Sequence, residues 1–355
     1  MTTSTLIIPA AGKSSRFPNM KPKWLLTHPS GRLMIDLVLD SADYLSYDRV
    51  IISILRQHCE EYGADIILKQ IFGSKVELFI IDEPTRSAAH TVYKTVKSCG
   101  ECGQITIKDS DCLVTFSHSV SLSHIVGLSV NHDTEVDRLQ QKSFIIKNDD
   151  NVVVDILEKN MVSNLICLGV YCVDSKSFIV AYDEICKNDV YSEFSEIYVS
   201  HVISYLIIFK NHIFEYVEAT GFVDWGTISD WRAELSRNNT YIFDIDGVFL
   251  KNCGQFGARN WSNYFEPIER NVEILQELSN LGHEIIFMTA RPEGYLDKFK
   301  NLLEEREIKY KTIIHGCNHS KRIIVNDFAN TNPFPSCESI SITRNGDLGL
   351  YIKTL

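Results

Sequence analysis

Apolar and polar positions alternate along the chain in segments that predict strands and helices in turn. Short apolar runs bounded by polar residues are typical of buried strands, and apolar positions three and four residues apart predict helices. In the first part of the chain the expected strands are Leu6–Pro9, Arg49–Leu55, Val76–Ile81, Gln104–Ile107, Ser143–Ile146, Val152–Leu157 and Ile166–Val173. The helices expected there are Met34–Leu45 and Ala88–Val96. Strands that alternate with helices predict a parallel sheet covered on both faces.

The same alternation starts again after the polar stretch Arg232–Asn239. The elements expected there are the strands Thr240–Asp244, Glu284–Thr289 and Ile323–Val325 and the helices Val272–Leu281 and Tyr295–Glu305. A chain of 355 residues also exceeds the length that one hydrophobic core usually serves. We therefore expect two α/β domains, residues 1–236 and residues 237–355.

The composition is that of an ordinary globular protein, with 45% apolar and 23% charged residues. A net charge of −11 argues against general nucleic-acid binding, which needs a broad basic face. The first residues lack the apolar region of a signal peptide, and the longest apolar run, Ile203–Phe209, is too short to span a bilayer. The ten cysteines have no framework spacing. We expect a cytoplasmic protein with no nucleic-acid partner and no membrane insertion.

Positive charge is concentrated near the start of this acidic chain. The segment Met1–Ile35 has no Asp or Glu, although the chain contains 46 of them. Its cations are Lys13, Arg16, Lys21, Lys23 and Arg32. The small residues Ala10, Ala11 and Gly12 follow an apolar strand, and backbone N–H groups in such a loop can hold phosphate oxygens. The segment predicts a phosphate site, and a solvated basic turn is the alternative.

The segment Leu6–Leu26 resembles the signature of the sugar-phosphate nucleotidyltransferases, in a form closer to the cytidylyltransferase-like members. The matching positions are Gly12, Arg16, Pro22 and Lys23. Four further segments resemble later motifs of the family in the same order: Ile105–Asp111, Glu158–Lys159, Gly169–Tyr171 and Val223–Thr227. The resemblance implies a Rossmann-like domain with a mixed α/β sheet.

The same resemblance assigns roles to individual residues. It implies that Arg16 holds a triphosphate, Lys23 holds the attacking phosphate, and Asp111 and Asp224 bind Mg²⁺. The residues implied to bind nucleotide or acceptor are Ala10, Ala11, Gly12, Lys13, Ser87, Glu158, Lys159 and Gly169. Such chemistry brings two anions together, so cations and a metal ion are needed to absorb the charge. For Asp111, a turn residue without a metal role is the alternative.

A second motif lies in the later domain, where a strand delivers Asp244 and Asp246 to one side. Two carboxylates so close need a cation between them or a shared proton. With Ile286–Arg291 and Ile323–Asp327, this segment resembles the haloacid dehalogenase-like (HAD-like) phosphatases, in a small capless Rossmannoid form. The resemblance implies that Asp244 is the nucleophile and Asp246 the acid and base.

Further residues of this second site follow from the same resemblance. It implies that Thr289, Ala290 and Lys321 bind the phosphoryl group and that Asp244, Asp246 and Asp327 hold Mg²⁺. The family usually offers more than one carboxylate in its fourth motif, whereas here Asn326 precedes Asp327. An alternative is therefore a catalytically inactive domain used for oligomerisation or ligand sensing.

Together the two resemblances imply a bifunctional enzyme with one Mg²⁺ site in each domain. One domain would transfer a nucleotidyl group, with CTP weakly favoured, to a sugar or polyol phosphate and release pyrophosphate. The other would hydrolyse a phosphate monoester of the same pathway, as in the synthesis of bacterial surface polysaccharide precursors. Because capless phosphatases of this kind typically borrow a lid, we also expect a homo-oligomer or a lid from the other domain. A non-enzymatic nucleotide-binding regulator would lack the metal aspartates and is the least favoured reading.

Overall fold

The computed structural model describes residues 3–12, 14, 16–100, 102–117, 122–131, 139–187, 196–254, 257–327 and 336–352. The chain divides into two compact units, Met1–Asp230 and Trp231–Leu355. Helix α7 (Ile228–Ser236) contains the boundary between them. Lys13, which the sequence assigns to the phosphate loop, lies outside the described residues.

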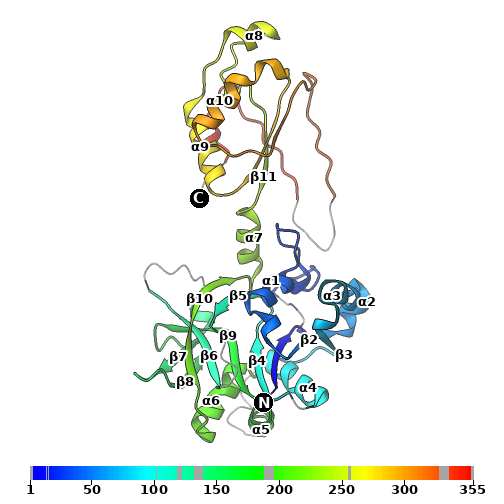
Figure 1. The fold of residues 1–355 in the computed structure, drawn as a ribbon, viewed down its shortest axis with the longest axis vertical. Coiled ribbons are helices and arrows are strands. Elements are labelled where there is room, and N and C mark those ends of the chain that lie inside the picture. Colours follow the sequence, from blue (N-terminus) through cyan, green and yellow to red (C-terminus); the bar gives the residue numbers. More distant parts are fainter. Residues whose placement is uncertain are drawn as a thin grey trace. The chain divides into compact units, whose positions relative to one another are not determined.

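The described part of the first unit is built on a ten-stranded mixed sheet (Figure 1). The strands are β1 (Ser4–Pro9), β2 (Arg49–Leu55), β3 (Glu77–Ile81), β4 (Gln104–Lys108), β5 (Cys112–Phe116), β6 (His124–Ser129), β7 (Ser143–Lys147), β8 (Val153–Glu158), β9 (Leu165–Asp174) and β10 (Glu215–Asp224). Their order is β3-β2-β1-β4-β9-β6-β10-β5, with β7 paired to both β8 and β9. Strands β3, β2, β1 and β4 are parallel, and β9 is antiparallel to β4 and β6.

Helices cover both faces of this sheet. They are α1 (Met34–Ser41), α2 (Arg56–Tyr62), α3 (Ala64–Phe72), α4 (Ala88–Cys99), α5 (Ser175–Ile185) and α6 (Val199–Lys210), with the short 3₁₀ helix η1 at Lys23–Leu25. Alternate residues of β1 point to opposite faces. Ile7 joins the core beneath α4, α5 and α6, whereas Leu6 and Ile8 join the core beneath α1 and α3. Burial on both faces explains why β1 and β2 are continuous apolar runs.

The second unit has a smaller parallel sheet of order β11-β12-β13 in its described residues. Its strands are β11 (Thr240–Phe243), β12 (Glu284–Met288) and β13 (Thr312–Ile314), and its helices are α8 (Ala258–Asn263), α9 (Glu269–Asn280) and α10 (Asp297–Glu305). Phe249, Phe287 and Phe299 are fully buried and meet edge to face. This unit therefore has a hydrophobic core of its own.

The elements expected in the first unit are all found, with two differences in detail, whereas β5, β6, β10, α2, α3, α5 and α6 were not expected. The alternation of strands and helices alone predicts a parallel sheet, whereas the observed sheet is mixed, as the family resemblance implies. The helix expected over Met34–Leu45 ends at Ser41, because Asp43 adopts a left-handed backbone conformation that starts a separate turn.

The prediction of a strand at Ile323–Val325 is wrong. These residues have no regular secondary structure and are exposed, Ile323 by 77% and Val325 by 89%. The reason is that a short apolar run becomes a strand only beside a pairing partner, and within the described residues the sheet consists of β11, β12 and β13.

No helix formed by the described residues has the length and apolar character needed to cross a membrane.

Candidate functional site

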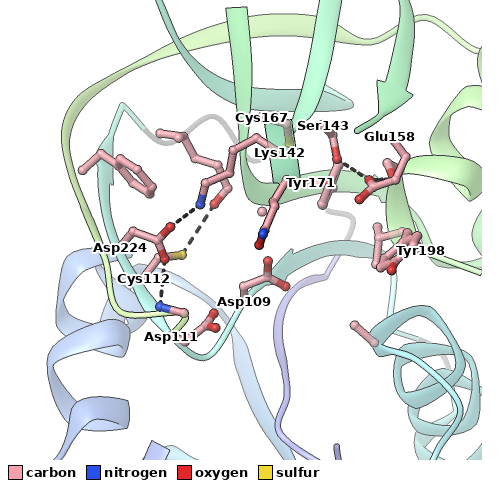
Figure 2. A pocket seen from close by; sticks show the side chains of 18 of the residues that line it. Asp109, Asp111, Cys112, Lys142, Ser143, Glu158, Cys167, Tyr171, Tyr198 and Asp224 are labelled. Carbon is pink, nitrogen blue, oxygen red and sulfur yellow. Dashed lines mark hydrogen bonds and ion pairs between the residues drawn. The ribbon is translucent and has the colours of Figure 1, made fainter. Parts of the chain in front are cut away.

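A cavity in the first unit is lined by residues that are distant in sequence (Figure 2). Those labelled in the figure are Asp109, Asp111, Cys112, Lys142, Ser143, Glu158, Cys167, Tyr171, Tyr198 and Asp224. Asp111 lies in the turn between β4 and β5, and Asp224 is the last residue of β10. Arg16 also lines the cavity and comes from the segment after β1. The topology thus brings together three of the residues that the sequence singles out.

Asp111 and Asp224 approach each other across Gly226. A Cβ atom added at Gly226 would lie 3.0 Å from Asp224 Oδ1 and 3.3 Å from Asp111 Oδ2. The backbone fixes this arrangement, since Trp225 N donates to Asp111 O at 2.8 Å and Gly226 N donates to Asp224 Oδ1 at 2.9 Å. Glycine is therefore the residue that leaves room between the two carboxylates.

Two lysines neutralise this pair of carboxylates. Lys23 Nζ forms an ion pair with Asp111, and Lys142 Nζ forms one with Asp224. Burial acts to raise the pKa of Asp111, but the charges of Lys23, Lys142 and Arg16 outweigh it and hold this pKa below its usual value. Burial acts to lower the pKa of Lys142, and the contact with Asp224 reverses this and raises it. Asp111 and Lys142 are therefore charged at neutral pH.

Asp109 packs against Gly169 beside this site. Asp109 N donates to Gly169 O at 3.0 Å, and a Cβ atom at Gly169 would lie only 2.2 Å from Asp109 Oδ2. Burial, together with the neighbouring charge of Asp111, raises the pKa of Asp109 well above its usual value. Lys108 is fully buried beneath the turn and donates to Cys112 O at 2.6 Å. Gly169, assigned to the acceptor by resemblance, thus makes room for an aspartate.

Glu158 lies at the other end of the cavity and is held by two serines. Ser200 Oγ donates to Glu158 Oε2 at 2.6 Å, and Ser143 Oγ donates to the same oxygen. Lys159 does not line the cavity: it is exposed, and its Nζ donates to Tyr198 Oη at 2.7 Å. Of the two residues of this motif, Glu158 therefore lines the cavity and Lys159 does not.

The small residues after β1 do not line the cavity: Ala10 and Ala11 are buried, and Gly12 is exposed. Ala10 N donates to Ser53 O at 2.8 Å. Gly12 has open space around its Cα, so a ligand could approach its backbone. Ser87 caps α4 by accepting from His90 N at 3.1 Å, and the next residue, Ala88, lines the cavity.

The donor set of Asp111 and Asp224 fits Mg²⁺. This ion is usually bound by one or two carboxylates, completed by water and substrate phosphates. In the part of the chain that the structure describes, no group of three or more His, Cys, Asp or Glu side chains is placed to hold a metal. Asp111 and Asp224, which meet across Gly226, supply the two carboxylates, and water and a phosphate ligand would have to supply the remaining ligands of the ion.

In the second unit, Asp246 and Arg291 form a buried ion pair. Arg291 Nη2 donates to Asp246 Oδ1 at 2.5 Å, and the Arg291 side chain is 2% exposed. Thr289 is fully buried, and its Oγ1 accepts from Arg291 N at 3.1 Å. Burial raises the pKa of Asp244, which follows β11 and lies near Asp246. The structure therefore brings together the two aspartates and the Thr-Ala-Arg segment that includes Ala290.

The remaining residues predicted for this second site are not brought to it. Lys321 and Asp327 are exposed in the segment that forms no strand. Asp244, Asp246 and Asp327 do not form a three-carboxylate group among the described residues, so this donor set does not fit the Mg²⁺ site expected there. The physical reason is the missing strand pairing, which would have carried Asp327 to the sheet edge. In this segment Arg322, not Lys321, is the cation whose charge partly opposes the burial that raises the pKa of Asp244.

Three residues of these sites were not found from the sequence. Lys142 stands directly before β7 without any motif around it, and Gly226 matters only because two distant turns meet there. Arg291 belongs to the motif Ile286–Arg291, so the Thr-Ala-Arg sequence was a usable signal for it.

Comparisons with known proteins support the same fold. No protein-family model matches the chain, and no curated protein matches it. A solved structure of a nucleoside-diphosphate-sugar pyrophosphorylase from Vibrio cholerae RC9 is similar over 65% of this chain and 99% of its own, with a TM-score of 0.56 and 20% identity. An inositol-1-phosphate CTP transferase from T. maritima covers 66% of this chain and 95% of its own, with a TM-score of 0.50 and 13% identity. The chain shares the mixed α/β fold of these proteins over about two thirds of its length, a share equal to that of the first unit.

Proposed function

We propose that residues 1–236 transfer a nucleotidyl group from a nucleoside triphosphate to the phosphate of a sugar or polyol phosphate. An oxygen of the acceptor phosphate forms a bond to the α-phosphorus, and the bond from that phosphorus to the bridging oxygen breaks, which releases pyrophosphate. The observation that carries this proposal is the convergence of Arg16, Lys23, Asp111 and Asp224 around one cavity that also contains Glu158. The names of the similar structures agree with it.

Each of these residues has a task that suits its position. Arg16 and Lys23 neutralise phosphate oxygens, so that the attacking and leaving groups can approach each other. Asp111 and Asp224 would hold Mg²⁺, which supplies charge stabilisation at the phosphates when it is bound. Glu158, fixed by Ser143 and Ser200, is placed to accept hydrogen bonds from acceptor hydroxyls.

Pyrophosphate release tests this proposal directly. The full chain is incubated with each of the four NTPs, Mg²⁺ and a panel of sugar and polyol phosphates, and CTP is the nucleotide we expect to work best. Lys23→Ala should abolish release, whereas Lys69→Ala, at an exposed position on α3, should not. The proposal fails if no combination releases pyrophosphate, or if Lys23→Ala is as active as the wild type.

For residues 237–355 we propose hydrolysis of a phosphate monoester. The Asp244 carboxylate would form a bond to phosphorus while the ester bond breaks, and Asp246 would protonate the leaving alcohol. Asp246 would then take a proton from water, whose oxygen bonds to phosphorus while the bond from Asp244 to phosphorus breaks and inorganic phosphate leaves. The fixed position of Asp246 against Arg291 and the proximity of Asp244 support this assignment. The two reactions would then be consecutive steps toward an activated sugar or polyol, carried out in the cytoplasm by a homo-oligomer, as for bacterial surface polysaccharide precursors.

A catalytically inactive second unit, used for oligomerisation or ligand sensing, is the second candidate, and the exposure of Asp327 favours it. A generic phosphate ester with Mg²⁺ distinguishes the two candidates. Turnover that disappears in Asp244→Asn supports the phosphatase, and no turnover by the wild type supports the inactive module. Size measurement in solution tests the homo-oligomer.

A further inference from the structure

Lys142 is the cation that the sequence motifs do not account for, and it lies inside the cavity. Its side chain is 21% exposed, its Nζ contacts Asp224, and the same atom lies 5.3 Å from the centre of the Phe222 ring. Keeping a lysine in such a place costs side-chain entropy and desolvation, since lysine is almost never buried unless paired. Lys159, which the family resemblance assigns to the acceptor, is exposed and bonded to Tyr198 instead.

The cations that line the cavity or pair with its aspartates come from two different walls. Arg16 and Lys23 belong to the segment after β1 that resembles the triphosphate loop. Lys142 belongs to the wall that carries the acceptor-facing groups: the next residue, Ser143, donates to Glu158, and Lys142 O accepts from Lys159 N at 3.0 Å. Figure 2 shows the Lys142 side chain reaching from this wall toward Asp224. Its ammonium group therefore lies at the aspartate pair, while its backbone belongs to the wall that carries Glu158.

An acceptor that offers hydroxyls to Glu158 must direct its phosphate toward the aspartate pair, where the α-phosphorus would lie. That phosphate is an anion entering a region already occupied by the carboxylates of Asp111 and Asp224. Among the described residues that line the cavity, the basic ones are Arg16 and Lys142. Of these, Lys142 is the one on the acceptor wall, whereas Lys23, which the resemblance assigns to the attacking phosphate, does not line the cavity and pairs with Asp111.

We propose that Lys142 binds the phosphate of the acceptor and so makes the cavity specific for phosphate monoesters of hydroxylated compounds. This rests on the proposed transferase function of the first unit. Before the acceptor arrives, Lys142 neutralises Asp224, and the flexible four-carbon stem lets the ammonium group change partner. The residue thus selects a phosphorylated acceptor against the corresponding free alcohol.

The test compares Lys142→Met with the wild type in two separate measurements on the full chain. Calorimetric titration with glycerol 3-phosphate and inorganic phosphate measures binding without turnover, and pyrophosphate release measures KM for acceptor and for NTP. Loss of a charge-assisted hydrogen bond should weaken binding of both probes and raise the acceptor KM by roughly 10- to 100-fold. The KM for NTP should stay within about twofold of the wild type, well under the tenfold that 1.4 kcal/mol would give.

Two further variants keep the test decisive. Lys142→Arg retains the charge and should recover part of the affinity, which also shows that the site folds. Lys147→Met removes the lysine at the far end of β7, one that donates to Asn151 Oδ1, and should leave probe binding unchanged. A wild type that binds neither probe overturns the inference. So does a Lys142→Met variant with an altered Mg²⁺ or NTP dependence but unchanged probe binding, which would mean that Lys142 only holds Asp224. Probe binding that needs Lys142 in a chain without pyrophosphate release supports the phosphate site and rejects the transferase function.

Discussion

The contact between Gly169 and Asp109 gives the sharpest test of the geometry of the first unit. Gly169 lies within β9 at a φ of +71°, and a Cβ atom there would lie 2.2 Å from Asp109 Oδ2 and 2.7 Å from Asp109 Cγ. Gly169→Ala therefore adds two costs. A side chain in the left-handed region costs about 1–2 kcal/mol. Forcing a packed carboxylate to move costs about 1–3 kcal/mol more.

The expected loss in the free energy of unfolding is thus about 2–5 kcal/mol, the sum of these two costs. For a domain of this size it corresponds to a fall in Tm of about 4–20 °C. Chemical denaturation of the full chain, followed by tryptophan fluorescence, measures it, since Trp24 and Trp225 are buried in this unit. Gly221→Ala in β10 is the matched control, because its Cβ would meet Thr115 Oγ1 at an ordinary 3.5 Å.

A double-mutant cycle separates the two costs. Asp109→Ala removes the two atoms that clash most, so Gly169→Ala should then cost only the backbone part, about 1–2 kcal/mol. The difference between the two backgrounds is the steric cost. An equal loss in both backgrounds would refute the reasoning, because it would mean that the carboxylate of Asp109 does not occupy the space beside Gly169.

Three further predictions concern other parts of the chain. Gly226→Ala places a methyl group between Asp111 and Asp224, so we expect a raised Mg²⁺ requirement for pyrophosphate release with little change in Tm; an unchanged Mg²⁺ dependence would contradict this. Burial lowers the pKa of His58 to about 4, so the unfolded chain takes up its proton first as the pH falls from about 6.5 to 4, and stability should decrease over that window by at most about 1.4 kcal/mol per pH unit. Urea denaturation at several pH values should show a flatter dependence for His58→Gln, and equal slopes would be evidence against it. Arg291→Met leaves the carboxylate of Asp246 without its buried partner and should destabilise the second unit by about 3–5 kcal/mol, measured by denaturation, whereas Arg291→Met with Asp246→Asn should recover part of the loss.

The sequence predicts those features that depend on local pattern. Strand β2 is found at Arg49–Leu55 because a long β-branched run buried on both faces has few other solutions. Asp111 and Lys23 can meet because β1 and β4 are neighbouring parallel strands and each residue lies in the segment that follows one of them. Such residues can be placed from the chain alone, as can Asp244 and Thr289 at the ends of two adjacent strands.

Features that depend on a distant partner could not be predicted in the same way. Lys142 has no local signal, because its role arises from the meeting of the β7 wall with the end of β10. Ile323–Val325 has the composition of a strand, but pairing needs a free neighbour in register, and the pattern does not report whether one exists. Lys159 looks like a ligand by its place in a motif, yet its left-handed backbone, with φ of +55°, directs the side chain to Tyr198.

The charge arrangement of the cavity links these observations to ligand order. Asp111 and Asp224 each hold one lysine, so without ligands the carboxylates and ammonium groups balance. A triphosphate entering alone would have to take Lys23 from Asp111, which would leave a partly buried carboxylate unpaired beside new negative charge. That cost falls if a divalent cation binds the two aspartates with the triphosphate, because the cation then replaces both lysines as their partner. Both lysines become available to phosphates in the same event. Affinity for the nucleotide and affinity for the acceptor phosphate should therefore both rise with Mg²⁺.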